Sequence, residues 1–190
     1  MTSTSPRLII GLTGYLRSGK DTAGAALIAD GFTRASFADK IRAFLHALNP
    51  QVVQNGVTYR LAPIIAGYGG WEEAKDQFPE VRALLQRCGA DAGRTVLGDN
   101  VWVDAAMREL GSGDVVFTDV RFPNEAEAIQ AAGGFIIRVT RPGHEPGPDA
   151  HVSETAMDGY PFDFHLPNIG GVSDLCENVR SLVRIARSIA

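Results

Sequence analysis

The sequence predicts an α/β protein whose parallel sheet is covered by helices on both faces. Short apolar segments alternate with helix-compatible segments along the chain, and the apolar ones are nearly continuous, which is typical of strands buried on both faces. A chain of 190 residues with 45% hydrophobic content can bury one such core. We therefore expect a single domain, 1–190, with a helical insertion at about 49–110 on the substrate side and a flexible lid at about 141–157.

The chain opens with a strand, a glycine-rich loop and a helix. The apolar run Arg7–Thr13 predicts the strand, and the Ala-rich segment Gly19–Asp30 predicts the helix. Phe32–Phe37 predicts a second strand. Residues 38–48 predict a helix with an apolar face made by Ile41, Phe44, Leu45 and Leu48.

The middle of the chain is the least regular part. Residues 49–79 contain several Pro and Gly residues that interrupt any long element, and we interpret them as an insertion over the core. Glu80–Leu97 and Val101–Leu110 then predict two amphipathic helices separated by a short turn.

The C-terminal half predicts three further strands, which brings the parallel sheet to five. In order, the expected elements are a buried strand at 114–120, a helix at 123–134, a strand at 135–140, a Pro/Gly-rich flap at 141–155, a strand at 162–166 and a helix at 173–189.

A phosphate-binding loop motif follows the first strand. Gly14, Gly19 and Lys20 have the spacing G-x-x-x-x-G-K, in which backbone N–H groups surround phosphates and the lysine reaches the β- and γ-phosphates. Asp21 stands where the motif has Ser or Thr, and Thr22 supplies a hydroxyl one position later. Because the strand–loop–helix context is also present, we expect a nucleotide site and a P-loop NTPase fold with three α/β/α layers.

Polar residues also follow the other predicted strands, and ligands of open α/β sheets bind beyond the carboxyl ends of the strands. A helix cap would equally explain Asp119, and a turn would equally explain Asn168.

Arginines are a further group of candidates, because guanidinium groups suit the neutralisation of a transferring phosphoryl group. The arginines that we consider for this task are Arg17, Arg121, Arg138 and Arg141.

The absence of certain motifs and the charge balance argue against several classes of protein. The chain lacks the guanine-reading N-K-x-D of switch GTPases and the L-S-G-G-Q of transporter ATPases, which leaves a small kinase. A net charge of −4 without a dense basic tract disfavours nucleic acid. No apolar run reaches membrane-span length, and the N-terminal MTSTSPR lacks signal-peptide features, so we expect a cytoplasmic protein. Cys88 and Cys176 predict free thiols.

The acceptor class stays open at this point. Asp39 would serve as a general base for a hydroxyl acceptor, as in a dephospho-coenzyme A kinase. The arginines favour an acceptor that brings its own negative charge. A nucleotide-binding module without turnover is a third reading.

Several segments together resemble the bacteriophage deoxynucleoside monophosphate kinases. The resemblance covers about residues 8–183, and its most specific parts are the GKDT loop and the segment D-V-R-F-P-N-E from Asp119. It implies transfer of the γ-phosphoryl group of ATP to a dNMP, with Mg²⁺, for DNA precursor synthesis. The implied location is the cytoplasm, which is that of the host if the chain is phage-encoded. The implied partners are small nucleotides, without nucleic acid or membrane, and a homodimer is left open. The other matching segments are 36–42, 84–94, 101–104, 151–154 and 168–171.

The resemblance implies roles for the matching residues. The residues that would hold ATP are Gly14, Arg17, Ser18, Gly19, Lys20, Asp21, Thr22 and, near the adenine, Asn168. Those that would contact the dNMP are Phe37, Asp39, Lys40, Arg94, Trp102, Arg121, Glu125 and Glu154. The catalytic set would be Lys20, Asp119, Arg121 and Arg141, and the metal would be held by Asp21, Thr22 and Asp119. Residues 49–79 match least, so the preferred base is not predicted.

Overall fold

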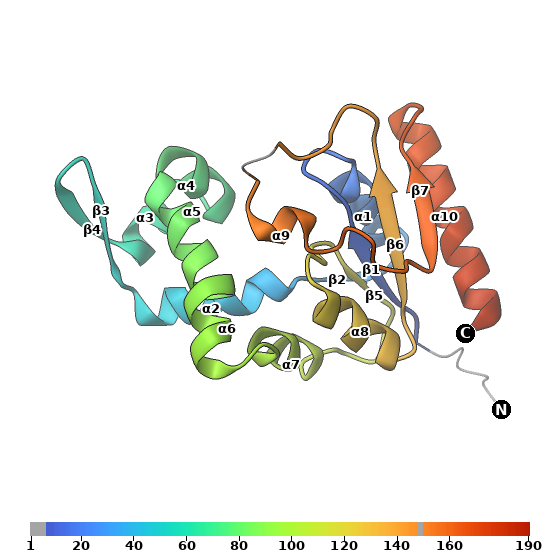
Figure 1. Ribbon diagram of the computed structural model, residues 1–190, viewed down its shortest axis with the longest axis horizontal. Helices are drawn as coiled ribbons and strands as arrows, with labels where there is room; N and C mark the ends of the chain where they lie inside the picture. Colours follow the sequence, from blue (N-terminus) through green and yellow to red (C-terminus); the bar gives the residue numbers. More distant parts are fainter. Residues whose placement is uncertain (1–6, 148–149) are drawn as a thin grey trace. The chain divides into compact units, whose positions relative to one another are not determined.

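The computed structural model describes residues 7–147 and 150–190, which form two compact units (Figure 1). One unit contains the described residues up to Phe37 together with Ala106–Ala190, and the other contains Ala38–Ala105. Most of the N-terminal tail considered above, 1–6, and residues 148–149 of the predicted lid lie outside the described residues.

The first unit is built on a five-stranded sheet in which every neighbouring pair of strands is parallel. The strand order is β2-β5-β1-β6-β7, so β1 lies at the centre between β5 and β6. This confirms the predicted five-stranded parallel sheet. The strands are β1 (Ile9–Thr13), β2 (Thr33–Ala35), β5 (Val115–Phe117), β6 (Phe135–Thr140) and β7 (Phe164–Pro167).

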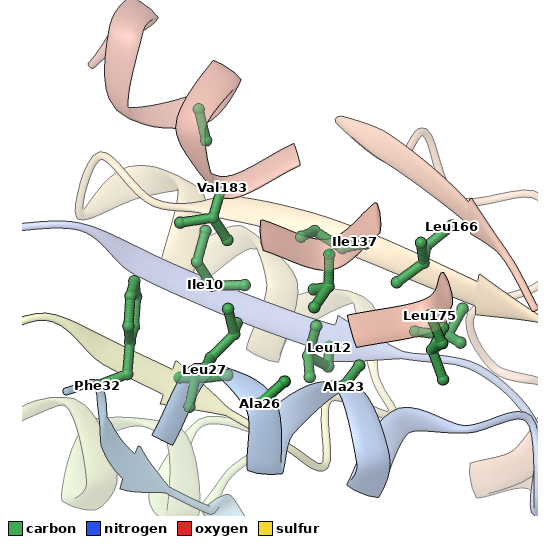
Figure 2. Packing of buried hydrophobic residues seen from close by; sticks show 14 of the residues in the cluster. Ile10, Leu12, Ala23, Ala26, Leu27, Phe32, Ile137, Leu166, Leu175 and Val183 are labelled. Atoms are coloured by element: carbon green, nitrogen blue, oxygen red, sulfur yellow. The ribbon is translucent and has the colours of Figure 1, made fainter. Parts of the chain in front are cut away.

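Helices cover both faces of this sheet. On one face, α1 (Lys20–Ala29) and α10 (Val172–Ile189) pack on Ile10, Leu12 and Ile137, as Figure 2 shows. The other face meets α8 (Pro123–Ala131), which approaches closely because β1 has a glycine there. A Cβ on Gly11 would lie 2.7 Å from Ile136 Cδ1 and 2.9 Å from Ile129 Cδ1. The result is the three-layer α/β/α architecture of P-loop NTPases.

The segment between β6 and β7 corresponds to the predicted lid. Its described part contains one short helix, α9 (Val152–Thr155), and continues past the buried Met157 to β7. No helix in the described ranges is long and apolar enough to cross a membrane.

The second unit has its own core, formed by residues that include Leu45, Val52, Leu61 and Val81. It contains most of α2 (Phe37–Leu48) and of α7 (Val101–Met107). Between them lie β3 (Gln51–Gln54), β4 (Val57–Arg60), α3 (Leu61–Gly67), α4 (Trp71–Gln77), α5 (Pro79–Gln86), the π-helical turn η1 (Arg87–Asp91) and α6 (Ala92–Leu97).

The expectation that residues 49–79 are irregular is wrong. Strands β3 and β4 pair antiparallel through Asn55-Gly56, whose φ angles of 52° and 77° suit a two-residue hairpin turn. Two helices follow directly. The Asn-Gly pair is itself a strong hairpin signal, and the neighbouring Pro and Gly residues obscured it.

Two smaller expectations also need correction, and a third needs refinement. The predicted second strand ends early because Phe37 already begins α2. The predicted apolar face of α2 is buried only in part, since Phe44 and Leu48 are 46% and 59% exposed. The helix predicted at 80–97 is present as an uninterrupted helical run over residues 79–97, in which the π-helical turn η1 lies between α5 and α6.

Candidate active site

The loop between β1 and α1 has a backbone that only glycine suits at two positions. Gly14 has φ 144°, and a Cβ there would lie 2.2 Å from the carbonyl oxygen of Val139. Gly19 has φ 108°, and its Cβ would lie 2.6 Å from Asn168 Nδ2. Both φ values fall in the region that favours glycine, so this loop has the backbone that the motif predicts.

Asn168 supports the loop from the end of β7. Its Nδ2 donates to the carbonyl oxygen of Ser18 at 2.9 Å, and its own N–H donates to Thr140 O at 2.7 Å. The Ser18 hydroxyl is buried within the loop without a hydrogen-bond partner among the described residues. Such a hydroxyl fits a site whose ligand supplies the missing acceptor.

Lys20 lies folded onto its own loop. Its Nζ donates to the carbonyl oxygens of Gly14 at 2.6 Å and Tyr15 at 2.7 Å. Burial, with the positive charge of Arg121 as the next cause, lowers the pKa of Lys20 to about 8, while Glu154 and Asp21 oppose that shift. Lys20 is therefore a poorly solvated cation whose ammonium group an anionic ligand would stabilise.

Arg121 follows β5 and is held by a buried carboxylate. Glu125, only 3% exposed, accepts the backbone N–H groups of Arg121 at 2.7 Å and Phe122 at 3.1 Å, which caps the start of α8. Glu125 is predicted above to contact substrate; the structure shows its carboxylate capping α8, and its role toward a substrate stays a prediction. The guanidinium of Arg121 forms an ion pair with Glu154 of α9.

Asp119 joins the end of β5 to the start of α2. Its carboxylate accepts the Ser36 hydroxyl at 2.6 Å and the Phe37 N–H at 3.1 Å. The Phe37 ring is buried and stacks on Phe117 with centroids 4.5 Å apart. The side chain of Phe37 is thus buried against β5, and its predicted place beside the substrate stays a prediction.

The remaining predicted residues of the first unit lie around the loop and the strand ends. Arg17 is exposed with φ 62°, Asp21 is exposed in the first turn of α1, and Thr22 is half-buried beside it. Arg141 is exposed directly after β6. The described residues contain no cluster of three or more His, Cys, Asp or Glu side chains that could hold a metal ion.

Four predicted substrate contacts belong to the second unit. Asp39 pairs with Arg42 at 3.2 Å, and Lys40 is half-buried on the same helix. Arg94 donates to the carbonyl oxygens of Gly89 at 3.2 Å and Asp99 at 2.9 Å. Trp102 is buried, with its ring edge-on to Phe44. Their roles toward a substrate stay predictions.

Sequence reasoning considered Arg138 but missed the two residues that it meets beside the loop, Tyr15 and Asp158. Asp158 accepts hydrogen bonds from the Tyr15 hydroxyl at 2.7 Å and from Arg138 Nη2 at 3.0 Å. Tyr15 and Asp158 are 143 positions apart. No local pattern marks such a pair, although Tyr15 lies within the loop motif.

Comparisons with known proteins agree with this architecture. No protein-family model matches the chain. A protein of Acanthamoeba polyphaga mimivirus, provisionally named a deoxynucleotide monophosphate kinase, is 29% identical over 93% of this chain and 96% of its own length. This relative is viral but does not come from a bacteriophage, so the bacteriophage part of the resemblance is not confirmed.

Solved structures resemble the chain over nearly its whole length. TT1252 from Thermus thermophilus has a TM-score of 0.50 and 18% identity, with 94% of this chain and 97% of that chain covered. This likeness concerns the fold alone. A dephospho-CoA kinase from Campylobacter jejuni reaches a TM-score of 0.44 at 13% identity over 95% and 97% of the two chains, which is too low to bear on activity.

Proposed function

We propose that this protein is an ATP-dependent kinase that phosphorylates deoxynucleoside 5′-monophosphates, giving dNDP and ADP. The observation that carries the proposal is the placement of Lys20 and Arg121 after the adjoining strands β1 and β5, close enough for Arg121 to depress the pKa of Lys20. Two cations that raise each other's energy are stabilised by a ligand of high negative charge. The similarity to the mimivirus protein supports the kinase class.

The phosphate-binding loop is the donor site in this proposal. Its backbone N–H groups and the N-terminal end of α1 bind the phosphates of ATP. Lys20 exchanges its two carbonyl contacts for the β- and γ-phosphates, which restores full charge to its amine. Gly14 and Gly19 leave the space that this close approach requires.

Arginines suit an acceptor that is already anionic. The guanidinium of Arg121 releases Glu154 and pairs with the phosphate of the dNMP, which offers the same bidentate geometry as a carboxylate. Arg141, directly after β6, adds positive charge from the other side of β1. Because a phosphate acceptor needs no general base, positioning and charge neutralisation provide the catalysis.

Mg²⁺ fits the oxygen donors of this site. The ion prefers hard oxygen ligands and keeps phosphate oxygens and waters, so few protein ligands are needed. Thr22 and Asp21 in the first turn of α1 would hold it, with Asp119 acting directly or through water. When bound, Mg²⁺ supplies charge neutralisation at the β- and γ-phosphates.

A coupled ADP-release assay with dGMP, dTMP, dAMP, dCMP and dephospho-coenzyme A tests this function. We expect turnover with one or more dNMPs. Turnover with dephospho-coenzyme A alone would identify a kinase of hydroxyl groups instead. ATP binding without turnover on any of the five acceptors would contradict the proposal and favour a binding module.

A further inference from the structure

Arg138 is a buried cation with an unusual environment. It is 6% exposed, and its guanidinium carbon lies 4.4 Å from the ring centroid of Tyr15 and 5.3 Å from that of Phe162. Along β6 it alternates with Ile137 and Val139, which belong to the core shared with α1 and α10. Its side chain therefore reaches the opposite face of the sheet.

Asp158 supplies the negative charge that this burial requires. Its Oδ1 accepts both Arg138 Nη2 at 3.0 Å and the Tyr15 hydroxyl at 2.7 Å. A buried charge is tolerated when it is paired and hydrogen-bonded, and Asp158 and the two rings meet that condition. The same carboxylate oxygen thus connects β6 to the phosphate-binding loop.

Tyr15 links Arg138 and Asp158 to Lys20, because its side chain contacts the first two residues and its carbonyl oxygen contacts the third. While its side chain is fixed by Arg138 and Asp158, its carbonyl oxygen accepts Lys20 Nζ at 2.7 Å and the Ser18 N–H at 3.1 Å. Rotation or displacement of Tyr15 would move an oxygen that orients Lys20 and closes the turn of the loop. The side chain of Tyr15 is therefore linked to the backbone of the phosphate-binding loop at Ser18 and, in the free protein, to Lys20.

We propose that Asp158 and Arg138 are positioning residues for ATP, which hold Tyr15 and through it the phosphate-binding loop in the shape that receives the triphosphate. This inference rests on the proposed function, because it assigns the two residues to the donor site of that kinase. Asp158 lies just after α9, so the segment whose Glu154 pairs with Arg121 also supports the loop.

Tyr15→Phe tests the proposal without changing charge. It keeps a ring over Arg138 and removes only the hydroxyl that donates to Asp158. We expect its Kd for a non-hydrolysable ATP analogue, measured by titration calorimetry, to rise about three- to tenfold, which is the range of one typical hydrogen bond. KM for ATP should rise by a similar factor. In contrast, kcat and the KM for the dNMP should stay within about twofold of the values of the unmodified protein.

Tyr160→Phe is the matched control, since the Tyr160 hydroxyl also donates to a side chain, Gln130 Oε1, at 2.7 Å. We expect its analogue affinity to equal that of the unmodified protein. Asp158→Ala and the double variant complete a cycle, because alanine leaves no acceptor for the Tyr15 hydroxyl. If the hydroxyl acts through Asp158, adding Tyr15→Phe to Asp158→Ala changes Kd by less than about twofold.

Two results would overturn the positioning role. One is an unchanged Kd in Tyr15→Phe, and the other is fully additive effects in the double variant. A failure of the unmodified protein to bind the ATP analogue would instead overturn the proposed function, so the two failures are distinguishable.

Discussion

Lys20 donates to two carbonyl oxygens of its own loop, so its side chain already lies where the loop would present phosphates. Lys20→Ala removes the only amine in that loop. We expect kcat to fall by roughly 10²-fold or more, as when a preorganised charge at a phosphoryl group is lost. The circular dichroism spectrum should not change, because the hydrogen bonds of Lys20 Nζ go to its own loop and it has no ion pair within residues 7–147 and 150–190. Lys75→Ala, on α4 and paired with Glu72, should retain activity; an active Lys20→Ala would contradict the assignment of the loop.

The depressed pKa of Lys20 predicts that ATP binding depends on pH. In the free protein the Lys20 amine has a pKa of about 8, so an increasing fraction of it is neutral above pH 8. ATP binding must then be accompanied by uptake of a proton at this amine, which weakens binding as the pH rises. We expect the Kd for the ATP analogue to increase about 25-fold from pH 7.5 to pH 9.5 if the bound amine stays fully charged. In Lys20→Arg, whose side chain stays charged, Kd should be nearly constant over this range. Calorimetric titrations at four or five pH values provide the comparison.

Arg121→Lys keeps a positive charge and loses the planar fork that pairs with Glu154 and, in our proposal, with a substrate phosphate. We expect kcat/KM for the dNMP to fall about 10- to 100-fold, while the Kd for the ATP analogue changes little. Arg184→Lys on α10, where the arginine donates to Ser181, is the control. Equal kinetics in Arg121→Lys and the unmodified protein would remove Arg121 from the acceptor site.

At the residue scale, the sequence predicts local geometry better than side-chain partners. The two loop glycines were predictable because their φ values and close approaches belong to one short motif. Phe37 and Glu125 follow strand ends as site residues do, yet one packs in the core and the other caps α8. A strand end places a residue at the ligand edge without deciding whether its side chain turns outward or inward.

At the element scale, the start of α8 determines where Arg121 stands. The Glu125 carboxylate satisfies two backbone N–H groups in a buried position. We expect Glu125→Ala to lower the free energy of unfolding by about 1–3 kcal/mol, because both groups lose a buried acceptor. Glu127→Ala, exposed on the same helix, should stay within about 0.5 kcal/mol of the unmodified protein. Urea titrations of both variants measure the difference, and equal midpoints would argue against the cap.

The elements themselves were predicted where hydrophobic periodicity is strong. All five parallel strands and helix α10 appear close to their expected bounds. The hairpin β3-β4 and the π-helical turn η1 were missed. Both depend on how a few residues pair or pack within the second unit, and Pro and Gly residues around them interrupt the periodicity on which the prediction relied.

At the scale of the whole molecule, the two units have separate cores. Leu61 is fully buried in the core of the second unit, while every residue proposed to bind ATP lies in the first. We expect Leu61→Ala to destabilise the protein by about 2–5 kcal/mol through the cavity it leaves. Below its melting temperature, however, this variant should bind the ATP analogue within about twofold of the normal affinity. Calorimetric unfolding and titration of one preparation give both values; a large loss of affinity would show that the donor site depends on the second core.

The strand order was beyond the reach of the sequence. Alternating strands and helices predict a parallel sheet, but β5 and β6 become the neighbours of β1 only through packing between distant segments. That order is what brings the loop after β1, Arg121 after β5 and Arg141 after β6 to adjoining positions. Site residues could therefore be proposed individually from the sequence, while their grouping required the fold.

Gly11 gives this grouping a consequence for the variation that the chain can tolerate. The absent side chain lets Ile129 of α8 approach β1, and α8 begins two residues after Arg121. A methyl group at Gly11 would require the side-chain ends of Ile136 and Ile129 to repack in the buried layer between β1 and α8. Substitutions at Gly11 should accordingly act through this buried contact, and a survey of natural variants that inspected only the ligand edge would overlook their cause.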